Sequence, residues 1–405
     1  MDSTVKNLLI TYSVFFFMGV MFSLDAIMPL FFSSIGVSVN EWGVLAATFG
    51  LGMLILEVTW GTLSDRFGKI IFMTGGLLLT ALIIPMYTIT VFLPLFFLLQ
   101  FLRGGFGVMI GPTGRAFVCH IVPLKKLGTA IGLLWASSSL GNAVGSVLFS
   151  YVADKWSYAS SFYLCSLLLF LAGVSASIGL RKTNSHEKPN RKHNGKMRRN
   201  LFSQSLKSIS KTKATSIILS FAIISFIQLG LIRTFIPIYA SQILNTSTFM
   251  VGLTQAVFNG FSVSFLPVCG IISDRIDKKY AIMIGFFVCF ISSIFYALTK
   301  DIYQLLFTTV GVSFGFSLLA PSILALLPTL IPKDVQGAVI GLYGSFENLG
   351  LMMAPIIFSF VWNFNPVYIF YACSTAQTFG IALAYLLKEP NNFKSVSRKI
   401  TYRSK

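Results

Sequence analysis

The chain carries the same short charged motif twice. Residues 61–69 read Gly-Thr-Leu-Ser-Asp-Arg-Phe-Gly-Lys, and residues 270–278 read Gly-Ile-Ile-Ser-Asp-Arg-Ile-Asp-Lys, an offset of 209 residues (270 − 61). Without a gap, this offset also carries residues 128, 132, 140 and 141 onto Gly337, Gly341, Leu349 and Gly350. The match indicates an internal duplication. A doubled hydrophobic bundle is typical of secondary transporters, whose substrate site lies between the two halves.

The composition is that of an integral membrane protein. Hydrophobic residues make up 55% of the 405 residues and charged residues 11%, whereas a soluble domain carries about 25% charged residues. Because a helix spans the hydrocarbon core with about 20 apolar residues, we predict an all-α integral membrane fold. Twelve transmembrane helices form two pseudo-symmetric six-helix bundles. The predicted spans are 7–32, 43–63, 70–90, 94–117, 128–150, 158–180, 215–240, 248–271, 280–299, 303–330, 337–361 and 367–387.

The positive charge follows the order of the predicted spans. The formal net charge is +18, and Lys and Arg are concentrated in alternate gaps between spans. The other gaps hold Glu41 and the pairs Asp154 with Lys155 and Lys300 with Asp301. This alternation is the positive-inside pattern. It predicts a multi-pass protein of the cell (plasma) membrane, with both termini in the cytoplasm and basic side chains on membrane lipids. A nucleic-acid partner is not expected, because no stacking platform accompanies the charge.

A strongly basic segment separates the two halves. Residues 181–213 contain eleven Lys or Arg and a single acidic residue, Glu187. Such a segment is typical of a tether that lies on an anionic lipid surface. We therefore predict an N-terminal six-helix bundle at 1–180, a basic cytoplasmic linker at 181–214, a C-terminal six-helix bundle at 215–388 and a basic cytoplasmic tail at 389–405.

Motifs for covalent or metal chemistry are not found in the sequence. The five cysteines form no Cys-x-x-Cys pair, and the three histidines show no metal-ligand spacing. A phosphate-binding loop with its Lys-Ser/Thr is also missing. We expect a protein that is not an enzyme, with no catalytic residues, metal or cofactor. Its energy would come from an ion gradient, from the substrate's own gradient or from a partner.

The repeated motif resembles the signature of the major facilitator superfamily, Gly-x-x-x-Asp-Arg-x-Gly-Arg/Lys. The first copy matches it at Gly61, Asp65, Arg66, Gly68 and Lys69. The second copy matches it at Gly270, Asp274, Arg275 and Lys278, with Asp277 in place of the second glycine. The resemblance covers essentially the whole chain. It implies that family's fold, rocking of the two bundles about a central site, and a gating role for both motif copies at the cytoplasmic helix ends.

The residue types in the first copy also suit a cytoplasmic turn. We expect Gly61 to allow close approach of a neighbouring helix and Gly68 to permit the tight turn. Asp65 can accept hydrogen bonds from amides at a helix end.

Charged residues inside the predicted spans are the candidates for binding. A charge at the bilayer centre costs about 2.5–3.5 kcal/mol on insertion scales, so it is functional by default. The candidates for binding substrate or protons are Asp25, Arg103, Arg233 and Glu347. For Glu57, we expect a structural ion pair with Arg115.

Position and repeat offset suggest a role for each candidate. Arg103 begins Arg-Gly-Gly-Phe-Gly, which is similar to the Arg-x-x-Gln-Gly motif of proton-coupled family members and so implies an influence on proton exchange. The offset carries Asp25 onto Thr234, next to Arg233, so the two charged residues should lie at comparable depth. The resemblance implies that the first and seventh helices meet near the extracellular gate, which leads to the hypothesis that Asp25 and Arg233 pair when this gate is closed. Asp25 is equally a candidate proton acceptor. For Glu347, substrate or proton binding and a helix-packing hydrogen bond both stay open.

A pocket rich in Phe, Met and Trp that contains one or two carboxylates suits amphipathic or cationic substrates, and the spans supply these residues. Residues 137–146 partly resemble the family's antiporter pattern, with Gly141 and Gly145 matching and Ser137, Asn142 and Ser146 departing from it. We expect a monomeric secondary transporter that exports such small molecules in exchange for protons. Two alternatives stay open. They are uptake of a small anionic metabolite held by Arg103 and Arg233, and a transport-inactive receptor or scaffold.

Overall fold

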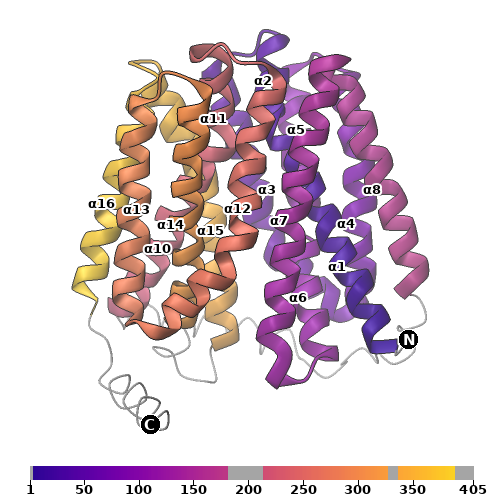
Figure 1. Ribbon diagram of the computed structural model, residues 1–405. Helices are drawn as coiled ribbons and strands as arrows, with labels where there is room; N and C mark the ends of the chain where they lie inside the picture. The colour runs from indigo at the N-terminus through magenta and orange to yellow at the C-terminus, as the bar shows by residue number, and fades with distance from the viewer. Residues whose placement is uncertain (1–2, 181–212, 327–335, 388–405) are drawn as a thin grey trace.

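A computed structural model describes residues 3–180, 213–326 and 336–387 (Figure 1). Within these residues, twelve helical spans are long and apolar enough to cross a membrane. They are Val5–Ser34, Val39–Phe67, Lys69–Thr88, Leu93–Ile121, Leu127–Lys155, Tyr158–Leu180, Ser216–Ile243, Thr248–Arg275, Lys278–Leu298, Ile302–Leu326, Leu342–Trp362 and Tyr368–Leu386. The predicted all-α fold with twelve spans is confirmed. The predicted tail and nearly all of the predicted linker lie outside the described residues.

The spans stand side by side in two bundles (Figure 1). The first bundle contains α1 (Ser3–Phe22), η1 (Ser23–Ala26), α2 (Met28–Ser34), α3 (Val39–Phe67), α4 (Lys69–Ile83), η2 (Ile84–Thr88), α5 (Leu93–Gly107), α6 (Ile110–Ile121), α7 (Leu124–Lys155) and α8 (Tyr158–Leu180). The second contains α10 (Lys213–Gly230), η4 (Leu231–Phe235), α11 (Ile236–Ile238), η5 (Tyr239–Ile243), α12 (Thr248–Arg275), α13 (Lys278–Leu298), α14 (Ile302–Leu326), α15 (Gln336–Trp362) and α16 (Tyr368–Leu386).

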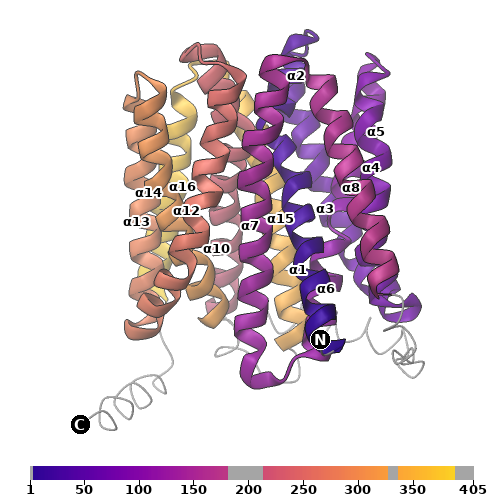
Figure 2. The same cartoon turned by 45° about the vertical axis from the view of Figure 1, so that its right-hand side comes forward.

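Two helix pairs form most of the contact between the bundles. Helix α7 packs against α12, and α3 packs against α15, as the two views show (Figures 1 and 2). Helix α1 begins and α16 ends at the same end of the molecule, the lower end in Figure 1. We call this end the termini side and the opposite end the distal side.

The first and seventh spans are both interrupted in their distal halves. Residues 23–26 form a 3₁₀ turn and residues 231–235 form a π turn, and the repeat offset carries residues 23–26 onto 232–235. Pro29 and Pro237 follow in the first turns of α2 and α11. A proline removes the hydrogen bond to the carbonyl four residues earlier, and those residues are Asp25 and Arg233. Each interruption therefore falls at a charged candidate residue.

Glycines bring the bundles together in the distal half. An added Cβ on Gly43 of α3 would collide with Ser359 of α15, and one on Gly252 of α12 would collide with Ser150 of α7. The offset of 209 carries the first glycine onto the second and Ser150 onto Ser359. The two crossings are thus repeats of one packing solution, in which a missing side chain lets two helices approach closely.

Four glycines of α7 and α12 toward the termini side have no close neighbour. A Cβ added at Gly128, Gly132, Gly260 or Gly270 would meet no atom within 4 Å. The two Gly–Ser crossings lie in the distal half, so the two bundles are closed at the distal side.

The α7–α12 crossing predicts a difference between two glycines of the same helix. Gly252→Ala should destabilise the protein by about 1–3 kcal/mol, because the new methyl group overpacks the crossing. Gly260→Ala should leave stability unchanged or slightly raised, since alanine has the higher helix propensity. Thermal unfolding of the purified variants in detergent measures both. Equal unfolding temperatures for Gly252→Ala and wild type would contradict the tight crossing.

Candidate transport site

Asp25 lies between two arginines in the distal half of the molecule. Arg103 Nη2 donates a hydrogen bond to Asp25 Oδ1 at 2.7 Å, and Arg233 Nη1 lies 3.8 Å from Asp25 Oδ2. Asp25 is 8% exposed and Arg103 is 3% exposed. Charged groups this deeply buried are tolerated only when they are paired.

The cluster of Asp25, Arg103 and Arg233 connects the two bundles. Asp25 is in η1 and Arg103 in α5, both in the first bundle, whereas Arg233 is in η4 of the second. The predicted contact of Asp25 with Arg233 is therefore present, and it is present while the distal side is closed. We call these three residues the distal charge cluster.

Aromatic side chains of the first bundle lie beside this cluster. The Arg103 guanidinium lies 4.5 Å from the centroid of the Phe49 ring, and that of Arg233 lies 5.3 Å from the Phe22 centroid. Such contacts stabilise a cation by cation–π attraction. Trp42 Nε1 donates a hydrogen bond to the Thr234 carbonyl at 3.3 Å, another link between the bundles. The rings exclude water, which strengthens the charge interactions among the three residues.

A small cavity adjoins the distal charge cluster. It measures about 20 Å³, and all three charged residues line it together with Gln100, Phe49 and Trp42. Gln100 is fully buried and accepts a hydrogen bond from the Tyr87 hydroxyl at 3.2 Å. The Nε2 of Gln100 and the Nε of Arg103 are both buried without a hydrogen-bond partner.

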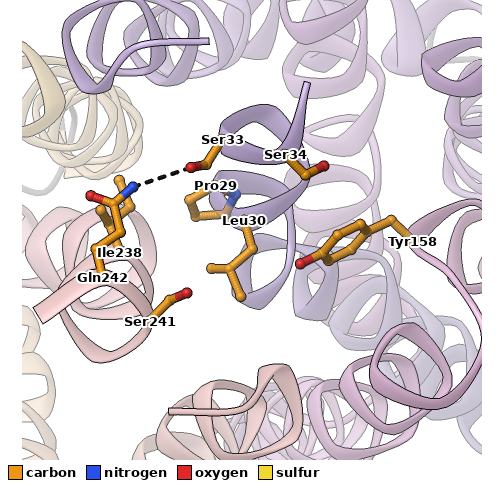
Figure 3. Close-up of a pocket in the computed structure, with 8 residues that line it drawn as sticks. All are labelled: Pro29, Leu30, Ser33, Ser34, Tyr158, Ile238, Ser241 and Gln242. Carbon is orange, nitrogen blue, oxygen red and sulfur yellow. Dashed lines mark hydrogen bonds between the residues drawn. The ribbon is translucent and has the colours of Figure 1, made fainter. Parts of the chain in front are cut away.

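A second, more open pocket of about 210 Å³ lies between α2, α8 and the η5 region (Figure 3). Gln242 Nε2 donates a hydrogen bond to Ser33 Oγ at 3.1 Å across this pocket. The two residues are repeat equivalents, 209 positions apart, as are Pro29 and Ile238 on its wall. Repeat-equivalent residues can face each other only near the axis that relates the two halves. The pocket therefore marks that axis at the distal side.

The termini half holds another charged group that connects the bundles. Glu57 Oε1 of α3 lies 3.8 Å from Arg115 Nη2 of α6, so the predicted ion pair is present. Glu57 Oε2 accepts a hydrogen bond from Asn348 Nδ2 of α15 at 2.7 Å. Glu347 is close enough to interact electrostatically with both Glu57 and Arg115, and the hydroxyl of Tyr343 is within its hydrogen-bonding reach.

The two motif copies cover the termini-side ends of α3 and α12 and the short turns that follow them. Gly68 has a φ of +101°, a backbone conformation that favours glycine, so its predicted role in the turn is confirmed. The predicted role of Gly61 is wrong, because an added Cβ there would meet no atom within 4 Å.

In the second copy, Lys278 Nζ pairs with Asp274 Oδ1 at 2.7 Å and donates to the Ser273 carbonyl. A gating role for the motif copies, including Asp65, Arg66, Lys69, Gly270 and Arg275, stays a prediction.

The structure brings three of the four candidate residues into one cluster and leaves Glu347 in the termini half. Sequence reasoning did not identify Gln100, Trp42 or Asn348 as members of these sites. The repeat offset does contain the signal for the Gly–Ser crossings, since it relates both the glycines and the serines. Among the described residues, no group of three or more His, Cys, Asp or Glu is placed to hold a metal ion.

The sequence profile of the Major Facilitator Superfamily matches residues 10–355 and 218–399. The chain belongs to this family. Its members are carriers rather than enzymes, so this major facilitator is a membrane transporter.

Similar proteins include named drug transporters. Multidrug resistance protein 1 of Bacillus subtilis is 23% identical over 91% of this chain and 92% of its own length. The multi-drug resistance efflux pump PmrA homolog of Lactococcus lactis is 25% identical over 97% of this chain and 96% of its own length. An uncharacterized MFS-type transporter of Methanocaldococcus jannaschii is 23% identical over 89% of this chain and 92% of its own length.

Solved structures show the same fold. A bacterial homolog of the human lysosomal transporter Spinster, in an inward-facing and occupied conformation, matches with a TM-score of 0.74. The match covers 95% of each chain at 11% sequence identity. The inward-facing and unoccupied conformation matches with a TM-score of 0.73 at 10% identity.

The distal charge cluster predicts non-additive effects on stability. Asp25→Asn should destabilise the protein by about 3–5 kcal/mol, because it leaves the buried Arg103 and the partly buried Arg233 without their carboxylate. The double variant Asp25→Asn/Arg233→Gln should recover part of this loss, since it returns the formal charge of the cluster to its original value. Thermal unfolding of the single and double variants forms a double-mutant cycle. A double variant less stable than Asp25→Asn would argue against the electrostatic coupling.

Proposed function

We propose that this transporter exports amphipathic or cationic small molecules across the cell membrane in exchange for protons, by alternating access. The observation that carries the proposal is the position of Asp25 between an arginine of its own bundle and an arginine of the other. A charge pair at a moving interface links the ionisation of one residue to the position of two bundles.

The electrostatics of Asp25 suit proton exchange. With the distal side closed, Asp25 contacts both Arg103 and Arg233. Separation of the bundles would remove Arg233 and leave Arg103 as the remaining partner, and we propose that Asp25 takes up its proton in this open arrangement. Proton binding and distal opening would then favour each other, because linkage is reciprocal. Protons would be taken up from the distal side and released when that side closes.

The charge of the termini half suits a cationic substrate. Glu57, Glu347 and Arg115 together carry one formal negative charge, and they lie near one another in the termini half. Trp135, which is 41% exposed, has its ring 5.6 Å from the Arg115 guanidinium. Carboxylates attract an organic cation, and an organic cation could replace the Arg115 guanidinium at the Trp135 ring. Glu347 is accordingly our candidate for substrate contact, with Glu57 and Asn348 holding the two bundles beside it.

The orientation follows from the charge pattern. Lys and Arg in the loops on the termini side support a cytoplasmic location for that side, so a distal-closed molecule would be open toward the cytoplasm. The relatives named as multidrug resistance and efflux proteins support export as the direction. One chain contains both bundles, so a monomer is sufficient for the cycle.

A second function is favoured by one observation, the excess of positive charge in the distal charge cluster. Two guanidinium groups and one carboxylate would attract a substrate with an anionic group, and arginine is well suited to bind carboxylates or phosphates. Uptake of a small anionic metabolite is therefore the alternative to export of cations.

Proton flux in inside-out vesicles tests the proposed export. We expect cationic drugs added outside acid-loaded vesicles to trigger proton release, reported by an internal pH-sensitive dye. Asp25→Asn should abolish this release, because it removes the exchangeable carboxylate. The matched control is Asp154→Asn, which changes an exposed acid at the end of α7 and should behave like wild type.

Two results would count against this proposal. Drug-triggered release that persists in Asp25→Asn would exclude Asp25 from the coupling path and move the role to Glu347. If no cation of a panel triggers proton release by the wild type, with expression confirmed, uptake of an anion would be favoured instead.

A native cysteine tests the orientation. Cys119, near the termini-side end of α6, is exposed, whereas the other four cysteines are buried. A membrane-impermeant maleimide should label the protein in inside-out vesicles but not in intact cells, and Cys119→Ser should remove the label. Labelling of intact cells would reverse the proposed topology.

A further inference from the structure

We propose that the cavity beside the distal charge cluster binds a halide-sized inorganic anion, chloride in the cell, which completes the charge balance of Asp25, Arg103 and Arg233. This inference goes beyond the proposed export function and does not depend on its direction or on its coupling ion. Three independent features carry it: the charge of the cluster, the unpaired donors on the cavity wall and the size of the cavity.

The charge of the cavity lining is unbalanced. Two guanidinium groups and one carboxylate line it, so its formal charge is +1. The single carboxylate is already engaged by both arginines, through Oδ1 and Oδ2 respectively. An uncompensated charge in a low-dielectric interior is unfavourable by several kcal/mol. A monovalent anion is the simplest particle that would remove this imbalance.

The cavity wall also offers hydrogen-bond donors. Arg103 Nε and Gln100 Nε2 are buried and have no partner, and both residues line the cavity. A buried donor without an acceptor is costly. Both groups can donate but not accept at these nitrogen atoms, so the particle that satisfies them must be an acceptor. An anion accepts from several donors at once.

The size of the cavity selects a small occupant. Its volume of about 20 Å³ is close to the space that one water molecule requires, about 10–15 Å³. A halide ion is only slightly larger than water, whereas the carboxylate group of an organic molecule carries a carbon chain that this space does not admit. Water would satisfy the donors without balancing the charge, which makes it the less favourable occupant.

The position of the cavity gives the anion a structural role. Arg103, Trp42 and Phe49 line it from the first bundle, and Arg233 and Leu351 line it from the second. An anion held here would contact both bundles and stabilise the distal-closed arrangement. It would leave the site when the bundles separate, because Arg233 moves away from Arg103.

Thermal unfolding of the full-length protein in detergent tests the proposal without any transport measurement. The protein is compared in sodium chloride, bromide, formate and gluconate at equal ionic strength. We expect chloride and bromide to raise the unfolding temperature above that in gluconate, with an effect that saturates with concentration, because a ligand of the folded state stabilises it.

A carboxylate introduced into the cavity would replace the anion. This substitution distinguishes chloride bound in the cavity from chloride bound at the protein surface. Gln100→Glu places a negative charge beside Arg103, so this variant should lose the chloride-dependent rise. The matched control is Gln304→Glu, an exposed position, which should keep the full response. Arg233→Gln, which removes the excess positive charge, should also lose the response and serves if Gln100→Glu does not fold.

Three outcomes would overturn the proposal. Equal unfolding temperatures in all four salts would assign the cavity to water. Stabilisation by formate without chloride would indicate a carboxylate site and favour the anionic substrate instead. A chloride response that survives in Gln100→Glu and Arg233→Gln would place halide binding elsewhere. Since none of these readings requires transport, they stand apart from the result of the proton-flux experiment.

Discussion

The contact of Asp25 with two arginines is the interaction on which the proposed transport cycle depends. A carboxylate that is 8% exposed is stable at this depth only because opposite charge lies beside it. One partner belongs to the same bundle and the other to the opposite bundle. Relative movement of the bundles therefore changes the electrostatic environment of a single ionisable group, which is the physical requirement for coupling an ion to a conformational change.

The duplication explains the packing of the two bundles but not the charges between them. Both copies of the first helix of a bundle are broken before a proline, Pro29 or Pro237, and both bundles use a glycine against a serine at the distal crossings. Packing depends on shape, so a duplicated sequence can satisfy it twice in the same way. The charges within the spans that are candidates for binding are not duplicated, since the offset carries Asp25 onto Thr234 and Glu347 onto Ser138. Identical charges at equivalent positions near the axis would repel each other.

The charged groups of the distal half and of the termini half also differ in sign. The distal charge cluster carries a formal +1, whereas Glu57, Glu347 and Arg115 carry a formal −1. This difference would let one protein bind a proton or an inorganic anion near the distal side and an organic cation near the termini side. Buried charges of opposite sense at different depths are consistent with exchange rather than with a single binding site.

The sequence by itself determined the class of this protein and its twelve spans, because hydropathy and an exact repeat offset are properties of the chain order. With the family resemblance it also suggested the pairing of Asp25 with Arg233, which the structure shows. It also predicted the ion pair of Glu57 with Arg115. The tertiary structure decided that Arg103 approaches Asp25, that Gln100 and Trp42 adjoin the cluster, and that Gly61 faces open space rather than a helix. These facts depend on how helices distant in sequence rotate and cross. Such geometry arises from side-chain packing between bundles, which no local pattern of residues specifies.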